Sequence, residues 1–107
     1  MASGVLGSND LGANTDTSVY TVPADTYSVV TVSICNRGSS TANIRIAVAA
    51  AASPAASEYI EYDVALGPNG VLERTGLVIG ENQILICRSS EASVSAVAYG
   101  IETTLPA

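Results

Sequence analysis

Residues 27–35 constrain the fold more than any other stretch of the sequence, because they combine β-branched, aromatic and small side chains and contain no helix former. Read at a period of two, Val30, Val32 and Ile34 share one face, and smaller or polar side chains alternate with them on the other. Branched side chains suit such a pleated surface because their χ1 angles are already restricted. The run therefore predicts a central β-strand. It ends at the turn-forming residues 36–40, after which residues 42–49 are expected to return as the second strand of a hairpin.

The remainder of the chain repeats this pattern at intervals of about ten residues, with turn signals between the runs. Further strands are predicted at residues 18–22, 58–66, 71–79, 83–88 and 94–103. Residues 67–70 form a strong turn signal, Gly76 indicates a bulge, and the alanine-rich residues 49–57 predict a loop with one helical turn. We therefore predict an all-β fold, a single antiparallel β-sandwich of about seven to eight strands that is Ig-like or jelly-roll-like.

Alternation also predicts which face of each strand is buried. In residues 58–66 it places Tyr62 toward the core and both Glu61 and Asp63 toward solvent. In residues 94–103 it puts Tyr99 on a face with larger apolar side chains, which we expect to pack in the core, and leaves alanines on the other face. Residues 83–88 are apolar on both faces and are predicted to be buried on both sides.

The first 17 residues differ from the rest, because small and polar residues dominate them and no periodicity is present. We predict an extended N-terminal arm at residues 1–17 and a β-sandwich domain at residues 18–107. The arm is expected either to fray or to become ordered against a neighbouring subunit.

Charge and composition exclude several classes of partner. Four basic residues stand against ten acidic ones, giving a net charge of −6, and the four arginines are scattered, so nucleic-acid binding is not expected. An acidic lipid leaflet would repel such a chain, and no apolar run is long enough to span a membrane, so no membrane partner is expected. The N-terminal residues do not resemble a signal peptide, which predicts synthesis in a cytoplasm. Cys35 and Cys87 are then expected to be reduced thiols, with a cross-sheet disulfide as the alternative.

Few residues suit catalysis. The chain has no histidine, which removes the common nucleophilic triads and most zinc sites, and it contains no nucleophile-elbow or phosphate-loop motif. Glu61 and Asp63, with Glu58 nearby, could form a glycosidase pair or a weak calcium site, but a solvated strand edge explains them better. We therefore predict a protein that is not an enzyme, with no catalytic, cofactor-binding or metal-ligating residues and no cofactor.

The tyrosines could provide a surface on which a sugar stacks: Tyr20, Tyr27, Tyr59, Tyr62 and Tyr99. Among them Tyr59 is the best exposed candidate, and an anchor in a protein interface is an equally good use for it. Arg45 and Arg74 lie in the middle of predicted strands and are expected to pair with acidic residues on neighbouring strands.

The segment between residues 19 and 102 resembles a small β-sandwich module of structural proteins in tailed bacteriophages. The resemblance rests on short motifs at residues 19–23, 33–38, 59–63, 69–76 and 98–100. Such modules occur as capsid decoration (cement) proteins and as parts of tail fibres. Because this chain is short and has a single domain, the resemblance implies a decoration protein.

The resemblance further implies a structural virion protein on the capsid exterior, made in the host cytoplasm. It would bind the major capsid protein and bridge neighbouring capsid subunits, so that the shell is stabilised. Self-association into a homo-trimer or homo-dimer is expected, because decoration sites lie on symmetry axes. The alternative is a tail-fibre or other appendage module that binds a surface glycan or an adaptor protein.

Overall fold

The computed structural model describes residues 2–106, so Met1 and Ala107, the outer ends of the predicted arm and domain, lie outside the described residues. This part of the chain contains eight strands: β1 (Ser3–Leu11), β2 (Thr17–Thr21), β3 (Thr26–Asn36), β4 (Ala42–Ala49), β5 (Tyr59–Leu66), β6 (Val71–Ile79), β7 (Ile84–Ser89) and β8 (Val94–Thr104). A single turn of 3-10 helix, η1 (Ala56–Glu58), lies in the alanine-rich connection where one turn was predicted. The seven predicted strands are confirmed to within one residue at either end. Within residues 2–106 no helix has the length and apolar character that crossing a membrane requires.

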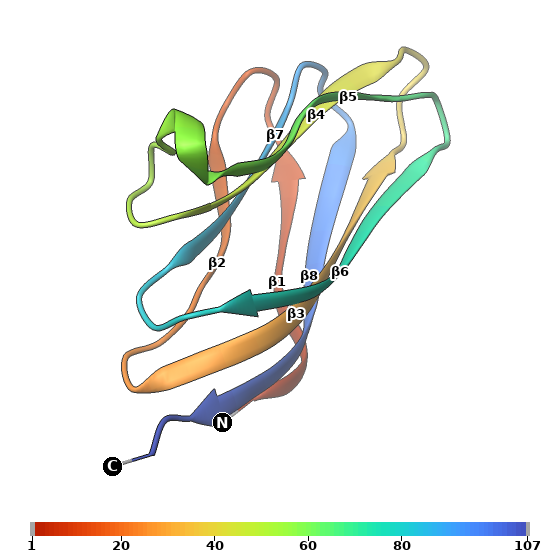
Figure 1. The fold of residues 1–107 in the computed structure, drawn as a ribbon. Helices are drawn as coiled ribbons and strands as arrows, with labels where there is room; N and C mark the ends of the chain where they lie inside the picture. The colour runs from red at the N-terminus through yellow and green to blue at the C-terminus, as the bar shows by residue number, and fades with distance from the viewer. Residues whose placement is uncertain (1, 107) are drawn as a thin grey trace.

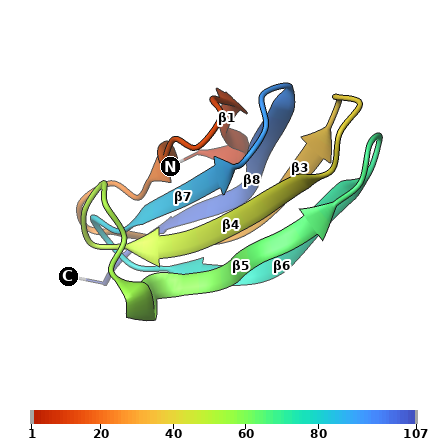
Figure 2. The same ribbon diagram turned by 90° about the horizontal axis from the view of Figure 1, so that it is seen from above.

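The strands form two antiparallel sheets of four strands each, packed face to face (Figures 1 and 2). Sheet A has the order β1-β8-β3-β6, and sheet B has the order β2-β7-β4-β5. The strands pair in nested fashion, β1 with β8, β2 with β7, β3 with β6 and β4 with β5. The chain is therefore one long hairpin rolled into two layers, which is the jelly-roll arrangement. The predicted β-sandwich is confirmed, in its jelly-roll form.

Strand β3 is central to sheet A, as its composition predicts. It pairs with β8 on one side and with β6 on the other, and Val30, Val32 and Ile34 are at most 1% exposed. The predicted hairpin between β3 and β4 is wrong, because β4 belongs to sheet B. The buried Asn36 explains the change of sheet. Its amide donates to the carbonyl oxygens of Ser40 (2.8 Å) and Leu66 (2.9 Å), and this fixes a link that crosses between the two layers.

The prediction that residues 1–17 form an arm separate from the sandwich is wrong for residues 3–11, which are strand β1 at the edge of sheet A. β1 pairs with β8 over most of its length, Leu11 is only 2% exposed, and Leu6 packs against the core. Because most residues of β1 are small or polar, the sequence shows no apolar alternation there. One of the small residues, Gly7, is nevertheless required for the packing of β1 against β2. A Cβ atom on Gly7 would lie 2.1 Å from the carbonyl oxygen of Val19, so only glycine lets β1 approach β2 this closely.

Strand β8 buries its small face, opposite to the prediction. Ala96 and Ala98 are fully buried, whereas Tyr99 is 37% and Ile101 is 52% exposed. In register, Ala98 lies beside Val32 of β3, whose branched side chains fill the space between the sheets. Small residues on β8 therefore leave room for large neighbours in the core, and its larger side chains lie on the outer surface of sheet A.

The core lies between the sheets, and a second, smaller apolar cluster lies on the outer face of sheet B. This cluster contains Ala47, Ala49 and Ile86, so β7 is buried on both faces as predicted. Cys87 is fully buried in the main core and Cys35 is partly exposed; both thiols are free. Burial raises the pKa of Cys87 to about 12, so its thiol is protonated and unreactive at neutral pH.

Candidate functional site

The acidic residues of η1 and β5, which the sequence offers as candidate carboxylates, do not form one cluster. Glu58 accepts hydrogen bonds from two backbone N–H groups of the preceding loop. Glu61 forms an ion pair of 3.2 Å with Arg74 of β6, across the edge between the two sheets, and Asp63 pairs with Arg45 of β4. The predicted acidic partners of both arginines are thus confirmed. No group of three or more potential metal ligands occurs in residues 2–106.

A bulge in β5 aims two neighbouring side chains at the same arginine. The register between β4 and β5 shifts between Ile44 and Ile46, so Tyr62 and Asp63 together oppose Arg45, and Asp63 has a φ of 53°. Arg45 donates hydrogen bonds to both oxygens of Asp63, at 2.7 and 3.3 Å, and its guanidinium carbon lies 4.1 Å from the centre of the Tyr62 ring. The hydrogen bond from Arg45 is the main reason why the pKa of Asp63 is lowered. Asp63 therefore stays ionised.

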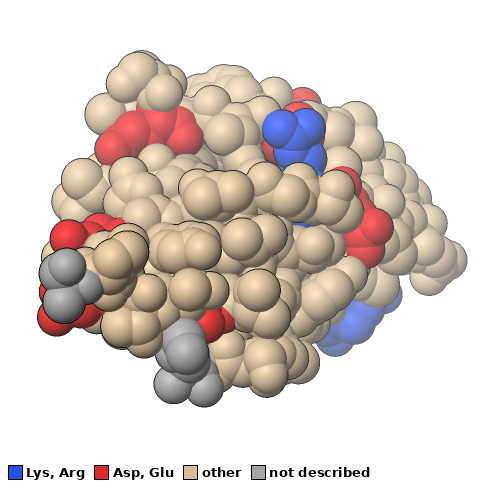
Figure 3. All heavy atoms as spheres, turned by 60° about the horizontal axis from the view of Figure 1, so that its bottom comes forward, with Lys and Arg blue, Asp and Glu red and all other residues tan. Residues whose placement is uncertain are grey.

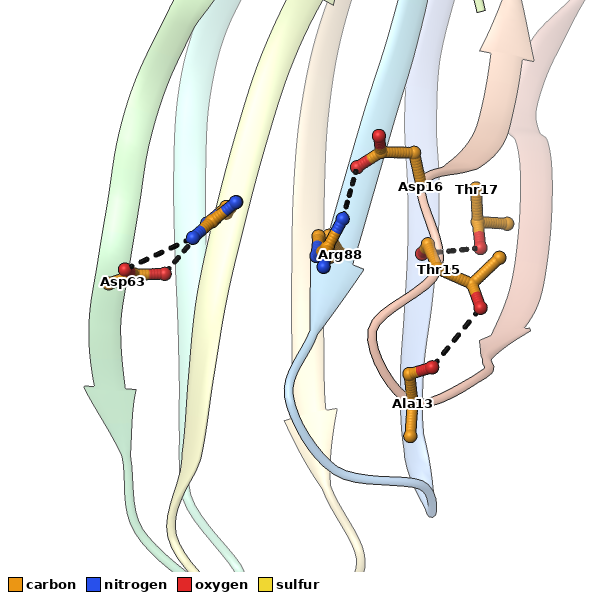
Figure 4. A network of polar contacts seen from close by, with 7 residues as sticks. Ala13, Thr15, Asp16, Thr17, Asp63 and Arg88 are labelled. Atoms are coloured by element: carbon orange, nitrogen blue, oxygen red, sulfur yellow. Dashed lines mark hydrogen bonds and ion pairs between the residues drawn. The ribbon is translucent and has the colours of Figure 1, made fainter. Parts of the chain in front are cut away.

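Four charged side chains form a row across the outer face of sheet B, in the order Asp16, Arg88, Arg45 and Asp63. Arg45 and Arg88 stand directly opposite each other on β4 and β7, a position in which like charges repel. Asp16 reaches from the β1–β2 connection toward β7, where its Oδ1 lies 3.6 Å from Nη1 of Arg88 (Figure 4). That buried oxygen has no hydrogen-bond partner within residues 2–106. Arg88 also donates no hydrogen bond to the described chain, so this ion pair is a loose one.

A polar hollow with a volume of about 180 Å³ opens beside this row. Its lining comes from β4, β5 and β7 and from the β1–β2 and β7–β8 connections. The lining residues are Asn14, Asn43, Arg45, Asp63, Arg88 and Ser90. Asn14 is held in place by its backbone N–H, which donates to the carbonyl oxygen of Ser89 at 2.7 Å. We call this hollow, with its six lining residues, the sheet B pocket.

Two tyrosines lie next to the sheet B pocket, and the structure contradicts the predicted face of one of them, Tyr62. Their ring centres are 5.0 Å apart with the planes at 84°, an edge-to-face contact. Tyr59, predicted to be exposed, packs against the small apolar cluster of sheet B. Tyr62, predicted to lie in the core, is 57% exposed. Tyr59 therefore faces outward as predicted but is partly covered, whereas Tyr62 is exposed because the bulge breaks the alternation on which its prediction depends.

The outer face of sheet A has a different character, because exposed apolar side chains cross it in register. Ile101 of β8, Val29 of β3 and Val78 of β6 are direct neighbours, with 52%, 37% and 70% of their surface exposed. Val5 and Tyr99, also opposite each other, extend the row toward β1. We call these five residues the sheet A row. Figure 3, which turns the lower side of Figure 1 forward, shows a broad uncharged surface with charged groups toward its margins.

Sequence reasoning identified Arg45 and Asp63 but missed the other members of the sheet B pocket. Asn43 alternates with Arg45 on an outward strand face, and Ser90 follows Arg88 at the same spacing, so a period of two contained a signal for these residues. Asn14 had no local signal, since only the pairing of β1 with β8 brings its loop against β7.

Comparisons of the chain with protein-family models, with curated proteins and with solved structures found no match.

Proposed function

We propose that this chain is a structural virion protein, which binds the outer surface of a phage capsid and bridges neighbouring capsid subunits. The observation that carries the proposal is the sheet A row, an apolar surface on a chain with a net charge of −6. Jelly rolls are frequent in viral capsid domains, which supports the proposal by analogy of fold.

The sheet A row suits contact with a coat protein because it is solvent-exposed and lies on paired strands. Its residues lie on four hydrogen-bonded strands, so little conformational entropy is lost when a partner covers them. Apolar surface removed from water contributes about 25 cal/mol per Å². A contact available only in the assembled shell stabilises that shell by mass action, because the ligand binds the assembled state alone.

In this proposal the acidic charge faces away from the packaged nucleic acid, and the subunits bind as dimers or trimers at symmetry axes of the shell. Strand β1 contributes Val5 to the sheet A row. The N-terminal segment therefore takes part in the proposed capsid contact as a sheet strand, in place of a free arm.

Sedimentation with capsids tests this proposal. The variant Val78→Lys places a charge in the middle of the apolar contact and is expected to weaken capsid binding by about tenfold or more, because a charge is costly to bury without a partner. Val71→Lys is the matched control, because Val71 is 61% exposed on the same strand but lies outside the sheet A row. Wild-type protein that does not sediment with capsids, or equal binding of both variants, would contradict the proposal.

A second candidate function is an appendage module that binds a surface glycan. The exposed Tyr62 ring beside the sheet B pocket favours it, since aromatic faces and polar pockets together suit carbohydrate ligands. A glycan array probed with the isolated protein would test this candidate: specific binding that Tyr62→Ala removes would support it, and an array without signal would count against it.

A further inference from the structure

We infer that the sheet B pocket binds an acidic sugar residue through its carboxylate. The inference names the ligand class for the second candidate function and does not depend on capsid binding. It rests on three features of the pocket: unused cationic donors, neutral polar groups beside them, and an exposed aromatic ring at the margin.

The unused donors belong to the two arginines. Arg45 presents one edge of its guanidinium to Asp63, through Nε and Nη2, and interacts more weakly with the Tyr59 side chain, so part of its donor capacity stays open to a further acceptor. Arg88 donates no hydrogen bond within residues 2–106; it forms an ion pair of 3.6 Å with Asp16, and its charge also lowers the pKa of Asp63. Guanidinium groups bind carboxylates in paired, fork-like contacts, so this arrangement suits a planar anion.

Repulsion between the arginines adds to the argument. They occupy directly opposed positions on β4 and β7, and the nearer partner of each lies on its outer side, Asp63 on β5 and Asp16 beyond β7. A carboxylate between the two guanidinium groups would relieve their repulsion. The pocket lining holds two arginines and one aspartate, and Asp16 beside it pairs with Arg88, so the two positive charges lie together between two negative ones.

Neutral groups around the cations favour a sugar over a bare ion. Asn14 and Asn43 contribute amide side chains and Ser90 contributes a hydroxyl, groups that can both donate to and accept from ring hydroxyls. Tyr62 is exposed at the margin of the pocket, and because the Arg45 guanidinium covers one face of its ring, the other face is the one that can pack against a pyranose. A volume of about 180 Å³ fits a single sugar residue.

Calorimetric titration of the full chain with glucuronate, glucose and inorganic phosphate tests the inference. Glucuronate is expected to bind with a Kd on the order of 1 mM, as suits one sugar in an open site, and raised salt is expected to weaken binding. Glucose should bind at least tenfold more weakly. Phosphate that binds as well as glucuronate would overturn the inference by showing a simple anion site, as would equal binding of glucose or no binding at all.

The variant Arg88→Gln locates the site. It should weaken glucuronate binding by about tenfold or more, whereas Arg37→Gln, which removes the same charge from an exposed side chain paired with Asp10, should have no effect. Equal loss in both variants would overturn the inference in favour of a general charge effect. If Arg88→Gln does not fold, NMR shifts of wild-type amides serve instead. Glucuronate should move those of Asn14, Asn43 and Ser90, and shifts confined to other regions would overturn the inference.

The two proposals for this surface can fail separately. A glycan array that reports a neutral glycan, together with no glucuronate binding, would overturn the acidic-sugar ligand and leave the glycan-binding function standing. An array without signal, together with glucuronate binding that Arg88→Gln weakens, would overturn the glycan-binding function and leave the acidic-sugar ligand standing.

Discussion

Tyr20 ties three strands and the N-terminal segment together through one side chain. Its hydroxyl lies 2.6 Å from the buried Ser28 Oγ of β3 and 2.5 Å from Oε2 of Glu102 on β8, and the other oxygen of Glu102 accepts from the backbone N–H of Ala2 at 3.1 Å. Burial, and next the hydrogen bond to Glu102, raise the pKa of Tyr20 to about 12. The pKa of Glu102 is lowered, mainly by the hydrogen bond from Tyr20.

This network predicts a loss of stability at alkaline pH. The folded pKa of Tyr20 lies above its ordinary value of 10.0, so its contribution is complete below pH 10 and is lost as the pH rises toward 12. Absorbance at 295 nm should show a late tyrosine titration that Tyr20→Phe removes. The variant should also unfold with a free energy lower by about 1–2 kcal/mol at pH 7, because Ser28 loses its partner.

Cys87 also loses a proton in this range, since burial raises its pKa from 9.0 to about 12. The free energy of unfolding should therefore still fall above pH 10 in Tyr20→Phe, but less steeply than in the wild type. Urea titrations at several pH values measure the difference. Parallel declines in the two proteins would show that Tyr20 ionises without a cost to the fold.

At the scale of the elements, the close approach of β1 to β2 decides whether the N-terminal residues join the sandwich. The approach depends on Gly7, where a Cβ atom would meet the Val19 carbonyl oxygen at 2.1 Å, far inside contact distance. The atom that the added Cβ would meet belongs to the backbone, so no flexible side chain can move aside to make room.

We predict that Gly7→Ala destabilises the isolated protein by about 1–3 kcal/mol, because β1 must shift away from β2. Gly12→Ala is the matched control: its nearest neighbour would be the Thr15 hydroxyl at 3.6 Å, an ordinary contact. Denaturant unfolding measures both variants. Identical midpoints for Gly7→Ala and the wild type would mean that β1 is not docked, and the arm interpretation would then be restored.

Strand positions could be predicted from the sequence because alternation and turn residues are local signals, as residues 27–35 illustrate. Pairings could not, because the jelly roll joins β1 to β8 from opposite ends of the chain, and no local pattern encodes that contact. The buried face of β8 was misjudged because its alanines match large residues on β3, a property of the assembled core. The prediction that Tyr62 points toward the core was wrong because the bulge in β5 breaks the alternation of inward and outward side chains at this residue.

The candidate site divides in the same way. Arg45 was expected to pair with an acidic residue of a neighbouring strand because it stands in the middle of its own strand, and Asp63 was one of the possible partners. Arg45 and Asp63 lie close to Arg88 and Asn14 because of the strand order in sheet B and the docking of the β1–β2 connection. Those are long-range features, so the pocket became visible only in the folded molecule.

At the scale of the whole molecule, the sheet A row and the sheet B pocket lie on opposite outer faces of the sandwich, with the main core between them. A subunit bound to a capsid through sheet A would therefore present the pocket to the surrounding solvent. No side chain belongs to both surfaces, since the row comes from β1, β3, β6 and β8, and the pocket comes from β4, β5, β7 and the β1–β2 and β7–β8 connections.

This separation predicts that the two surfaces act independently, since distant sites without shared partners contribute additively, to within about 0.5 kcal/mol. Val78→Lys should weaken capsid binding by about tenfold or more and leave the Kd for glucuronate unchanged, whereas Arg88→Gln should weaken glucuronate binding to the same extent and leave capsid binding unchanged. The double variant should show both losses at the sizes found in the single variants. Capsid-bound protein should bind glucuronate with the Kd of the free protein, because coat protein on sheet A leaves the pocket open. A weaker affinity on the capsid would place the pocket inside the contact and would reverse the proposed orientation.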